Sequence, residues 1–363
     1  MEVDPSFFQE NERTAPTQDG KKFFEIGSFV TESGETIPQV VVAYETWGKL
    51  NPAADNAILV CHALSGDSHA VGWWDRIVGP GLAIDTDRFF VIGTNALGGC
   101  QGTTGPGTLA PNGRRWGSRF PQVTVGDMVE VQMQLVTGLG IQTLLGVAGG
   151  SMGGMQALEW TLRRPGAVRR CWMTASCAAH SPMQIGFNET ARQAILRDPK
   201  WCGGDFDPSN PPADGLAVAR MVGHLSYLSA VSFDRKFGRR RQAGGPADQF
   251  EVESYLNYQG EKFVSRFDAG SLVVLSKAID LYERTSLAGS TSEYLLTSFS
   301  SDTLYEPRQS QAVHELALAA GCRSRHLTFD LPMGHDTFLL DGEQQARVAR
   351  DFWENGIENR GSW

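Results

Sequence analysis

The sequence predicts an α/β protein whose mostly parallel central sheet is flanked by helices and carries an inserted helical segment. Short β-branched and aromatic runs alternate with helical patterns over most of the chain. Several of these runs are almost wholly apolar, which is typical of strands covered on both faces. Between residues 178 and 291 the alternation stops and helical periodicity replaces it.

The expected elements follow in order along the chain. A polar lead-in over residues 1–35 contains the first strand. We expect strands at residues 23–30, 39–44, 57–61, 89–94, 144–148, 171–174, 294–299 and 326–329, and helices at 125–137, 153–164, 307–319 and 342–353. Repetition of strand, helix and strand favours parallel pairing.

The segment 178–291 shows helical periodicity at 187–197, 216–228 and 251–281, separated by prolines and glycines. Structureless loops longer than about 15 residues are uncommon in compact domains. We therefore expect a core domain formed by residues 1–177 and 292–363, and a helical lid domain formed by residues 178–291.

Composition excludes several classes of function. The chain has 363 residues and a formal net charge of -9, which gives no support to nucleic-acid or anionic-membrane binding. We find no apolar run long enough to span a membrane and no signal-peptide pattern near Met1. Six scattered cysteines without zinc-type spacing indicate a reducing compartment, by default the cytoplasm.

The most informative stretch is the apolar run 144–148, which leads into Gly149-Gly150-Ser151-Met152-Gly153 and then a helical pattern. A strand running through Gly-x-Ser-x-Gly into a helix is typical of a sharp turn that exposes a nucleophilic serine. A glycine-rich nucleotide-binding turn is the alternative, but its GxGxxG and GK[ST] patterns are absent. The pattern predicts Ser151 as the nucleophile.

A serine nucleophile needs a base, commonly histidine. Among the histidines after the helical segment, His314 lies in an expected helix and His326 near the start of an expected strand. His335 follows the last expected strand across a short loop, where this architecture places its base. We assign His335 as the base.

The acid that orients the base is expected at the carboxyl end of a strand. Asp302 lies just past the apolar run 294–299. Its rivals are Asp330, at the end of the last strand, and Glu306, at the start of a helix. We assign Asp302.

The oxyanion hole is expected from the backbone N–H groups of Met152, directly after the nucleophile, and Leu64, in the loop after an early strand. His62 and His69 in that loop raise the alternative of a metal site. Without a third spaced ligand, we interpret both as partners in local hydrogen bonds and expect no metal.

Beyond these residues, several longer motifs resemble the homoserine O-acyltransferases, of the homoserine O-acetyltransferase type, within the α/β-hydrolase superfamily. The motifs are CHALSGDSH at 61–69, GWWD at 72–75, NALGGCQGTTGP at 95–106, WGSRFP at 116–121, GGSMGG at 149–154, ARMVGHLSY at 219–227, SRFD at 265–268 and GHD at 334–336. They span nearly the whole chain in the family's order. The resemblance implies an α/β-hydrolase fold with an inserted helical lid.

The resemblance further implies a ping-pong acyltransferase of methionine biosynthesis that uses acyl-CoA, with acetyl-CoA favoured, as co-substrate and L-homoserine as acceptor. It implies that Arg220 holds the acceptor carboxylate, Asp336 its amine, and that Tyr227 lines the acceptor site. These roles also make physical sense, because a guanidinium suits a carboxylate and an acidic group suits an ammonium. A homodimer through the lid helices is implied as well.

Three alternatives stay open at this stage. Relatives in the family use succinyl-CoA as donor, and some acylate L-serine. A plain serine esterase or thioesterase would need the same three catalytic residues.

Overall fold

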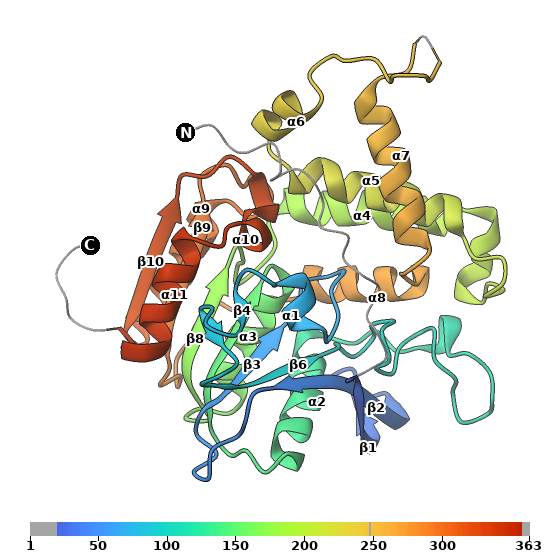
Figure 1. The fold of residues 1–363 in the computed structure, drawn as a ribbon. Helices are drawn as coiled ribbons and strands as arrows, with labels where there is room; N and C mark the ends of the chain where they lie inside the picture. Colours follow the sequence, from blue (N-terminus) through green and yellow to red (C-terminus); the bar gives the residue numbers. More distant parts are fainter. Residues whose placement is uncertain (1–19, 247, 358–363) are drawn as a thin grey trace.

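The computed structural model describes residues 20–246 and 248–357 (Figure 1). The expectation that the chain has no signal-peptide pattern concerns mainly residues 1–19, which lie outside the described residues. An eight-stranded sheet has the order β1-β2-β6-β3-β7-β8-β9-β10. Its strands are β1 (Lys22–Val30), β2 (Thr36–Trp47), β3 (Ala57–Cys61), β6 (Phe90–Thr94), β7 (Leu144–Gly150), β8 (Val168–Thr174), β9 (Glu293–Phe299) and β10 (Ser324–Phe329).

All eight expected strands are confirmed, and the pairing is parallel from β6 through β10. At one edge of this sheet, β2 pairs in antiparallel fashion with both β1 and β6. Two features were not expected: a small parallel pair, β4 (Val78–Gly79) with β5 (Ile84–Asp85), and the short helix α1 (Ala70–Trp73). Both lie in the stretch between β3 and β6.

Helices cover both faces of the sheet. Those of the core are α2 (Val125–Gly138), α3 (Met152–Arg163), α9 (Pro307–Ala319), α10 (Thr337–Leu340) and α11 (Gln344–Asn355). The alternation of side chains along β3 places Leu59 in a cluster with α2, α3 and α9, and Val60 in a cluster with α1 and α11. Because successive side chains of a strand point to opposite faces, both faces of this strand are buried, as its wholly apolar sequence predicts.

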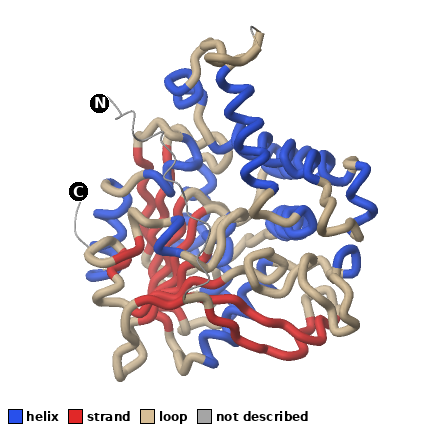
Figure 2. The backbone as a smooth tube through the Cα atoms, turned by 45° about the vertical axis from the view of Figure 1, so that its right-hand side comes forward, coloured by secondary structure: helices blue, strands red, loops and turns tan. Residues whose placement is uncertain are grey.

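The segment 178–291 is helical, as expected. It contains α4 (Pro182–Leu196), α5 (Ala213–Tyr227), α6 (Ala230–Lys236), α7 (Glu251–Val264) and α8 (Ala269–Asp280). Helices α4 to α7 stand apart from the strands, above one end of the sheet (Figures 1 and 2). The division into a core and a lid stays our proposal for the domain organisation.

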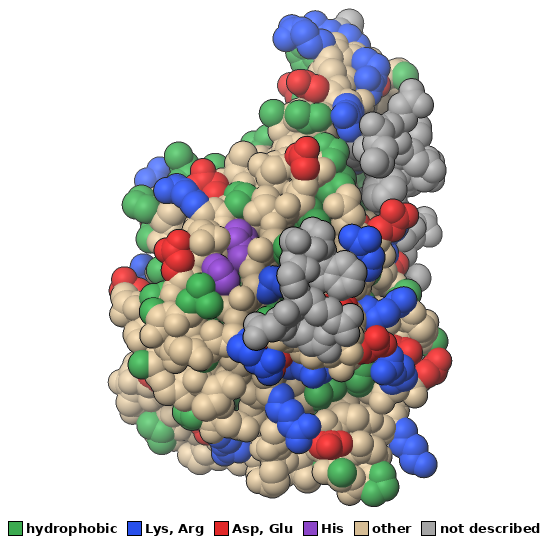
Figure 3. Space-filling model, turned by 90° about the vertical axis from the view of Figure 1, so that its left-hand side faces the viewer, with side chains coloured by type: hydrophobic (Ala, Val, Ile, Leu, Met, Phe, Trp, Pro, Cys, Tyr) green, Lys and Arg blue, Asp and Glu red, His purple; other side chains and the backbone are tan. Residues whose placement is uncertain are grey.

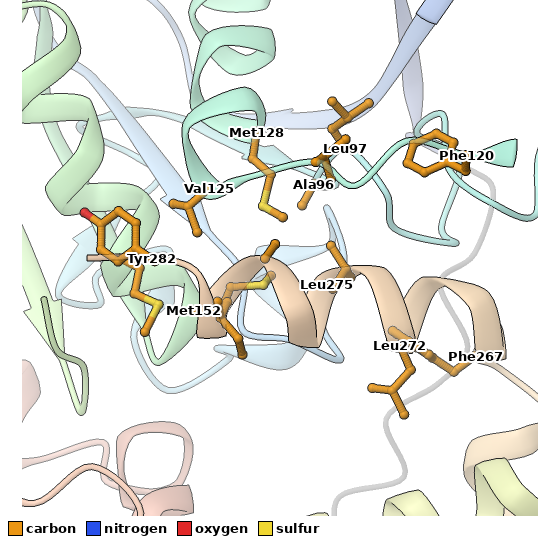
Figure 4. Close-up of a cluster of buried hydrophobic side chains, with 14 of the residues drawn as sticks. Ala96, Leu97, Phe120, Val125, Met128, Met152, Phe267, Leu272, Leu275 and Tyr282 are labelled. Atoms are coloured by element: carbon orange, nitrogen blue, oxygen red, sulfur yellow. The ribbon is translucent and has the colours of Figure 1, made fainter. Parts of the chain in front are cut away.

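One expectation was wrong in detail. The periodicity over 251–281 forms two helices, because the chain leaves helical geometry at Asp268, whose carboxylate then caps α8 by accepting the N–H of Ser271 at 2.9 Å. Helix α8 packs its apolar face on the core, where Leu272 and Leu275 share a cluster with Leu97 and Met152 (Figure 4).

Three consecutive arginines lie on the surface. Arg239, Arg240 and Arg241 lie exposed in the connection between α6 and α7, and Figure 3 shows basic side chains at that protruding end. In the described residues, no single helix is long and apolar enough to cross a membrane. The pair α5 and α6, bent by 105°, meets the criteria of length and composition only when the two are taken together.

Candidate active site

Ser151 occupies a strained turn between β7, which ends at Gly150, and α3, which begins at Met152. Its backbone has φ 57° and ψ -125°, a conformation that non-glycine residues rarely adopt and that is concentrated at functional sites. Strand and helix nearly touch here, since a Cβ atom on Gly149 would overlap the backbone of Gly153. The strained turn predicted from the Gly-x-Ser-x-Gly pattern is therefore present.

Asp302 and His335 form a buried hydrogen-bonded pair. The Nδ1 of His335 is 2.8 Å from Oδ2 of Asp302, and their side chains are 4% and 0% exposed. The other carboxylate oxygen of Asp302 accepts the backbone N–H groups of Leu304 and Tyr305 at 2.9 and 2.8 Å. Both residues lie just beyond the carboxyl ends of β9 and β10, and an aspartate in this position can fix the tautomer and orientation of its histidine.

The rival residues are engaged elsewhere. Asp330 accepts the hydroxyl of Ser300 at 2.6 Å, and Glu306 precedes α9 without capping it through its side chain. His314 contacts the Ser324 hydroxyl at 2.8 Å, whereas His326 lies between Gln311 and Ser298. None of the four joins the pair of Asp302 and His335.

The Ser151 side chain lies close to the phenol of Tyr305. Burial raises the pKa of Tyr305 well above its usual value, and a hydrogen bond with the Ser151 side chain opposes that rise. Catalytic hydrogen bonds are often long before substrate binds and tighten in the complex. The proposal that Ser151 passes its proton to His335 therefore rests on the placement of both residues at this edge of the sheet.

Two backbone N–H groups are candidates for the oxyanion hole. Met152 is the first residue of α3, and the first N–H groups of a helix have no partner within the helix. The end of β3 lies against this helix start, since a Cβ atom on Gly153 would overlap the carbonyl of Cys61. Leu64, in the loop that follows β3, packs against the hydrophobic cluster that contains Met152.

His62 and His69 are tied into local hydrogen bonds, in agreement with our interpretation. The Nε2 of His62 accepts the backbone N–H of Ala96 at 2.9 Å, and its Nδ1 donates to the carbonyl of Ala63 at 2.7 Å. The Nδ1 of His69 is 2.7 Å from the buried carboxylate of Glu45. No group of three potential metal ligands occurs among the described residues.

The three candidate acceptor-binding residues lie near His335. The ring of Tyr227, at the end of α5, has its centroid 5.9 Å from that of His335. Arg220 lies one to two turns earlier on α5, with its guanidinium carbon 5.8 Å from the Tyr227 ring and its Nη1 3.5 Å from the Ser65 hydroxyl. Burial raises the pKa of Tyr227, Arg220 lowers it, and Asp336 raises it again. Opposite charges thus act on one tyrosine beside the base.

Sequence reasoning missed two residues of this site, Tyr305 and His180. The imidazole Nε2 of His180 is 2.7 Å from the Tyr305 hydroxyl, although the two residues are 125 positions apart. Tyr305 lies only three residues after Asp302, which was a usable signal. Nothing in the sequence around His180 connects it with the nucleophile.

Comparison with known proteins agrees with this geometry. A family described as the alpha/beta hydrolase fold matches residues 56–339. Fold and strained serine turn therefore define the chain as an α/β-hydrolase. Homoserine O-acetyltransferases from Methanococcoides burtonii and Leptospira meyeri are 45% and 46% identical to it, covering 90% of the chain and 72% and 91% of the relatives. Within the α/β-hydrolases, the chain belongs to the homoserine O-acetyltransferase family.

Solved structures with the same fold include both a transferase and an esterase. The homoserine O-acetyltransferase from Bacillus anthracis matches with a TM-score of 0.87 at 27% identity, over 93% of this chain and 98% of that one. Esterase E22 matches with a TM-score of 0.86 at 30% identity, over 92% and 99%. A transferase and an esterase thus share this architecture, so activity has to be argued from the site.

Proposed function

We propose that this protein transfers an acetyl group from acetyl-CoA to the side-chain hydroxyl of L-homoserine, a step of methionine biosynthesis, through an acetyl-Ser151 intermediate. The observation that carries the proposal is the pair of opposite charges, Arg220 and Asp336, which shift the pKa of Tyr227 in opposite directions beside His335. A zwitterionic amino acid needs one cationic and one anionic partner, whereas a simple ester substrate needs neither.

In the first half-reaction, the Ser151 oxygen attacks the thioester carbonyl while His335 takes the serine proton. The N–H groups of Leu64 and Met152 stabilise the oxyanion. The carbon–sulfur bond then breaks, and His335 returns the proton to the departing thiolate of CoA. Asp302, held by two backbone N–H groups, keeps His335 in the orientation that both transfers require.

In the second half-reaction, the hydroxyl of homoserine attacks the acetyl-serine ester, and His335 takes its proton. Collapse of the tetrahedral intermediate breaks the bond to Ser151, whose oxygen recovers the proton from His335. Arg220 would bind the acceptor carboxylate, Asp336 its ammonium group, and Tyr227 would pack against its chain. Holding the hydroxyl in place gives homoserine an advantage over water as the attacking group.

A two-stage assay tests the proposal. Purified protein is mixed with acetyl-CoA, and CoA release is followed with and without L-homoserine while intact mass reports the covalent intermediate. We expect a mass increase of one acetyl group without homoserine, and continuous CoA release with it. The Ser151→Ala variant should show neither; an acetyl adduct that persists in this variant would contradict the assignment of the nucleophile.

The likeness to esterase E22 supports a second candidate, hydrolysis of acetyl esters. CoA release that proceeds at the same rate with and without homoserine would favour it. Crossing acetyl-CoA and succinyl-CoA with L-homoserine and L-serine settles donor and acceptor. We expect the pair of acetyl-CoA and L-homoserine to be preferred.

We also propose a cytoplasmic homodimer. All six cysteines are free thiols, which suits a reducing compartment. On the proposed lid, Met183, Val218, Leu225 and Val231 are exposed apolar side chains of α4, α5 and α6. Such a surface gains stability when it is buried against a second copy. Sedimentation equilibrium measures the mass directly, and a mass equal to one chain would rule out the dimer.

A further inference from the structure

Tyr305 contacts Asp302 and His335 of the proposed catalytic triad directly, and it lies close to the third member, Ser151. Its backbone N–H donates to Oδ1 of Asp302 at 2.8 Å. Its ring stacks on the imidazole of His335, with centroids 4.8 Å apart and planes inclined by 18°. The Ser151 side chain lies close enough to its hydroxyl to lower the pKa of Tyr305. The residue is only 3% exposed, so these contacts are shielded from bulk water.

The Tyr305 hydroxyl also has a hydrogen-bond partner, the buried side chain of His180. The Nε2 of His180 lies 2.7 Å from it, and the Nδ1 of His180 lies 2.9 Å from Oδ1 of Asp280. The side chains of His180 and Asp280 are 2% and 3% exposed. Arg192 of α4 pairs with Asp280 at 2.7 Å and neutralises its charge. A buried series of hydrogen bonds thus runs from Asp280 of α8 through His180 to Tyr305.

The charge of Asp280 decides where one proton of this hydrogen-bonded series lies. Burial favours the neutral form of Asp280, but hydrogen bonds from His180, Asn188 and Arg192 outweigh it, and the pKa of Asp280 lies below its usual value. Asp280 is therefore a carboxylate that only accepts, so Nδ1 of His180 carries a proton. Its Nε2 is left to contact the Tyr305 hydroxyl at 2.7 Å.

We propose that Tyr305 is a further catalytic residue of the acyl transfer, and that His180 is a positioning residue that acts through it. The proposal rests on the proposed function and deepens it. His180 fixes the Tyr305 hydroxyl, whose oxygen faces the Ser151 hydroxyl and limits it to one position. When the thioester binds, the serine proton has only to swing from Tyr305 to His335, while the stacked ring of Tyr305 prevents the imidazole from tilting away.

Packing alone is the competing explanation, and the chain offers a matched control for it. Tyr282 is also a buried tyrosine, 5% exposed, within the same hydrophobic cluster as Tyr305. Its hydroxyl has no hydrogen-bond partner in the part of the chain that the structure describes. Tyr282→Phe and Tyr305→Phe therefore remove the same atom from similar surroundings, but only the second removes the link between His180 and Ser151.

The test measures the reactivity of Ser151 without CoA or homoserine. A fluorophosphonate probe forms a phosphorus–oxygen bond with an activated serine and releases fluoride, while the base takes the serine proton. The second-order labelling rate is measured for the full-length wild type, Tyr305→Phe, Tyr282→Phe, His180→Gln and the double variant Tyr305→Phe/His180→Gln. Thermal unfolding of each variant reports whether it folds.

We expect Tyr305→Phe to label about 3- to 10-fold more slowly, as loss of one buried hydrogen bond implies, and Tyr282→Phe to match the wild type. If His180 acts only through Tyr305, His180→Gln slows labelling to a similar extent, and the double variant is no slower than Tyr305→Phe. Acetylation by acetyl-CoA should slow in parallel, with the KM for homoserine unchanged.

An unchanged or faster rate in Tyr305→Phe would overturn the proposal, since the phenol would then only fill space or withhold the serine proton. If the losses in labelling rate were additive in the double variant, His180 would not act through Tyr305, and its part of the proposal would be wrong. Should His180→Gln fail to fold, the comparison of Tyr305→Phe with Tyr282→Phe decides alone. Normal labelling of the wild type without homoserine-dependent turnover would count against the proposed function and leave the role of Tyr305 intact.

Discussion

The backbones of Gly149 and Gly153 lie so close that a Cβ atom on Gly149 would overlap the carbonyl group of Gly153. This contact joins the end of β7 to the first turn of α3 and holds Ser151 between them at φ 57°. The strained conformation persists only because the surrounding structure enforces it.

Replacing Gly149 with alanine should therefore disturb the nucleophile as well as the fold. We expect Gly149→Ala to lower the free energy of unfolding by about 1–3 kcal/mol, typical of overpacking in a well-packed core, and to lower the labelling rate of Ser151. Gly186→Ala in α4 is the control, because nothing lies within 4 Å of the added atom. There the better helix propensity of alanine should leave stability unchanged or raise it. Urea unfolding measures the free energy of unfolding of both variants, and an equal change in the two would contradict this account.

Asp302→Asn should leave the fold intact and remove most activity. An asparagine can hold the wrong tautomer of His335, and the corresponding change in the serine-protease worked example costs about 10⁴ in kcat. Asp330→Asn, at the rival position that contacts Ser300, is the matched control and should keep wild-type turnover. The check is steady-state CoA release; a large loss in Asp330→Asn with little loss in Asp302→Asn would reverse the assignment.

Arg220→Ala should weaken the second half-reaction alone. A hydrogen bond to a charged group contributes about 1.5–3 kcal/mol, so the KM for homoserine should rise about 10- to 100-fold. Arg220→Lys should recover only part of this, because an ammonium lacks the planar fork of the guanidinium. Arg197→Ala, at an exposed position after α4, should change neither step. Slower acetylation from acetyl-CoA in Arg220→Ala would argue against a role in acceptor binding.

His224 makes the fold sensitive to acid. Burial, followed by the nearby cations Arg220, Lys236 and Arg266, lowers the pKa of His224 to about 2. Because the unfolded chain binds a proton at this residue below pH ~6.5 and the folded chain does not, its contribution to stability is complete above that pH. As pH falls further, the contribution is lost at about 1.4 kcal/mol per pH unit.

Urea unfolding at several pH values checks this effect. Between pH 7 and pH 5, the wild type should lose about 2 kcal/mol more than His224→Gln. Between pH 7 and pH 8 the two proteins should change in parallel, which serves as the internal control. Identical slopes below pH 6 would mean that His224 accepts its proton in the folded state.

Local sequence patterns determined much of this protein. Short β-branched and aromatic runs predicted all eight strands of the main sheet. Inner strands such as β3 are almost wholly apolar because both of their faces are buried. The glycines around Ser151 predicted the strained turn, because only small residues allow strand and helix to approach so closely. Chain order and position after β9 and β10 favoured Asp302 and His335 over their rivals as catalytic residues, and the structure places these two in one hydrogen-bonded pair.

Tertiary structure alone decided the rest. The periodicity over residues 251–281 did not reveal that the chain turns at Asp268 and starts a second helix, α8, which packs on the core. That outcome depends on which surface each helix can bury. Tertiary structure also brings together Asp280, His180 and Tyr305, which are far apart in sequence, in one hydrogen-bonded series. Hydrogen bonds between such distant side chains leave no periodic trace in a sequence, since only the folded backbone sets their separation.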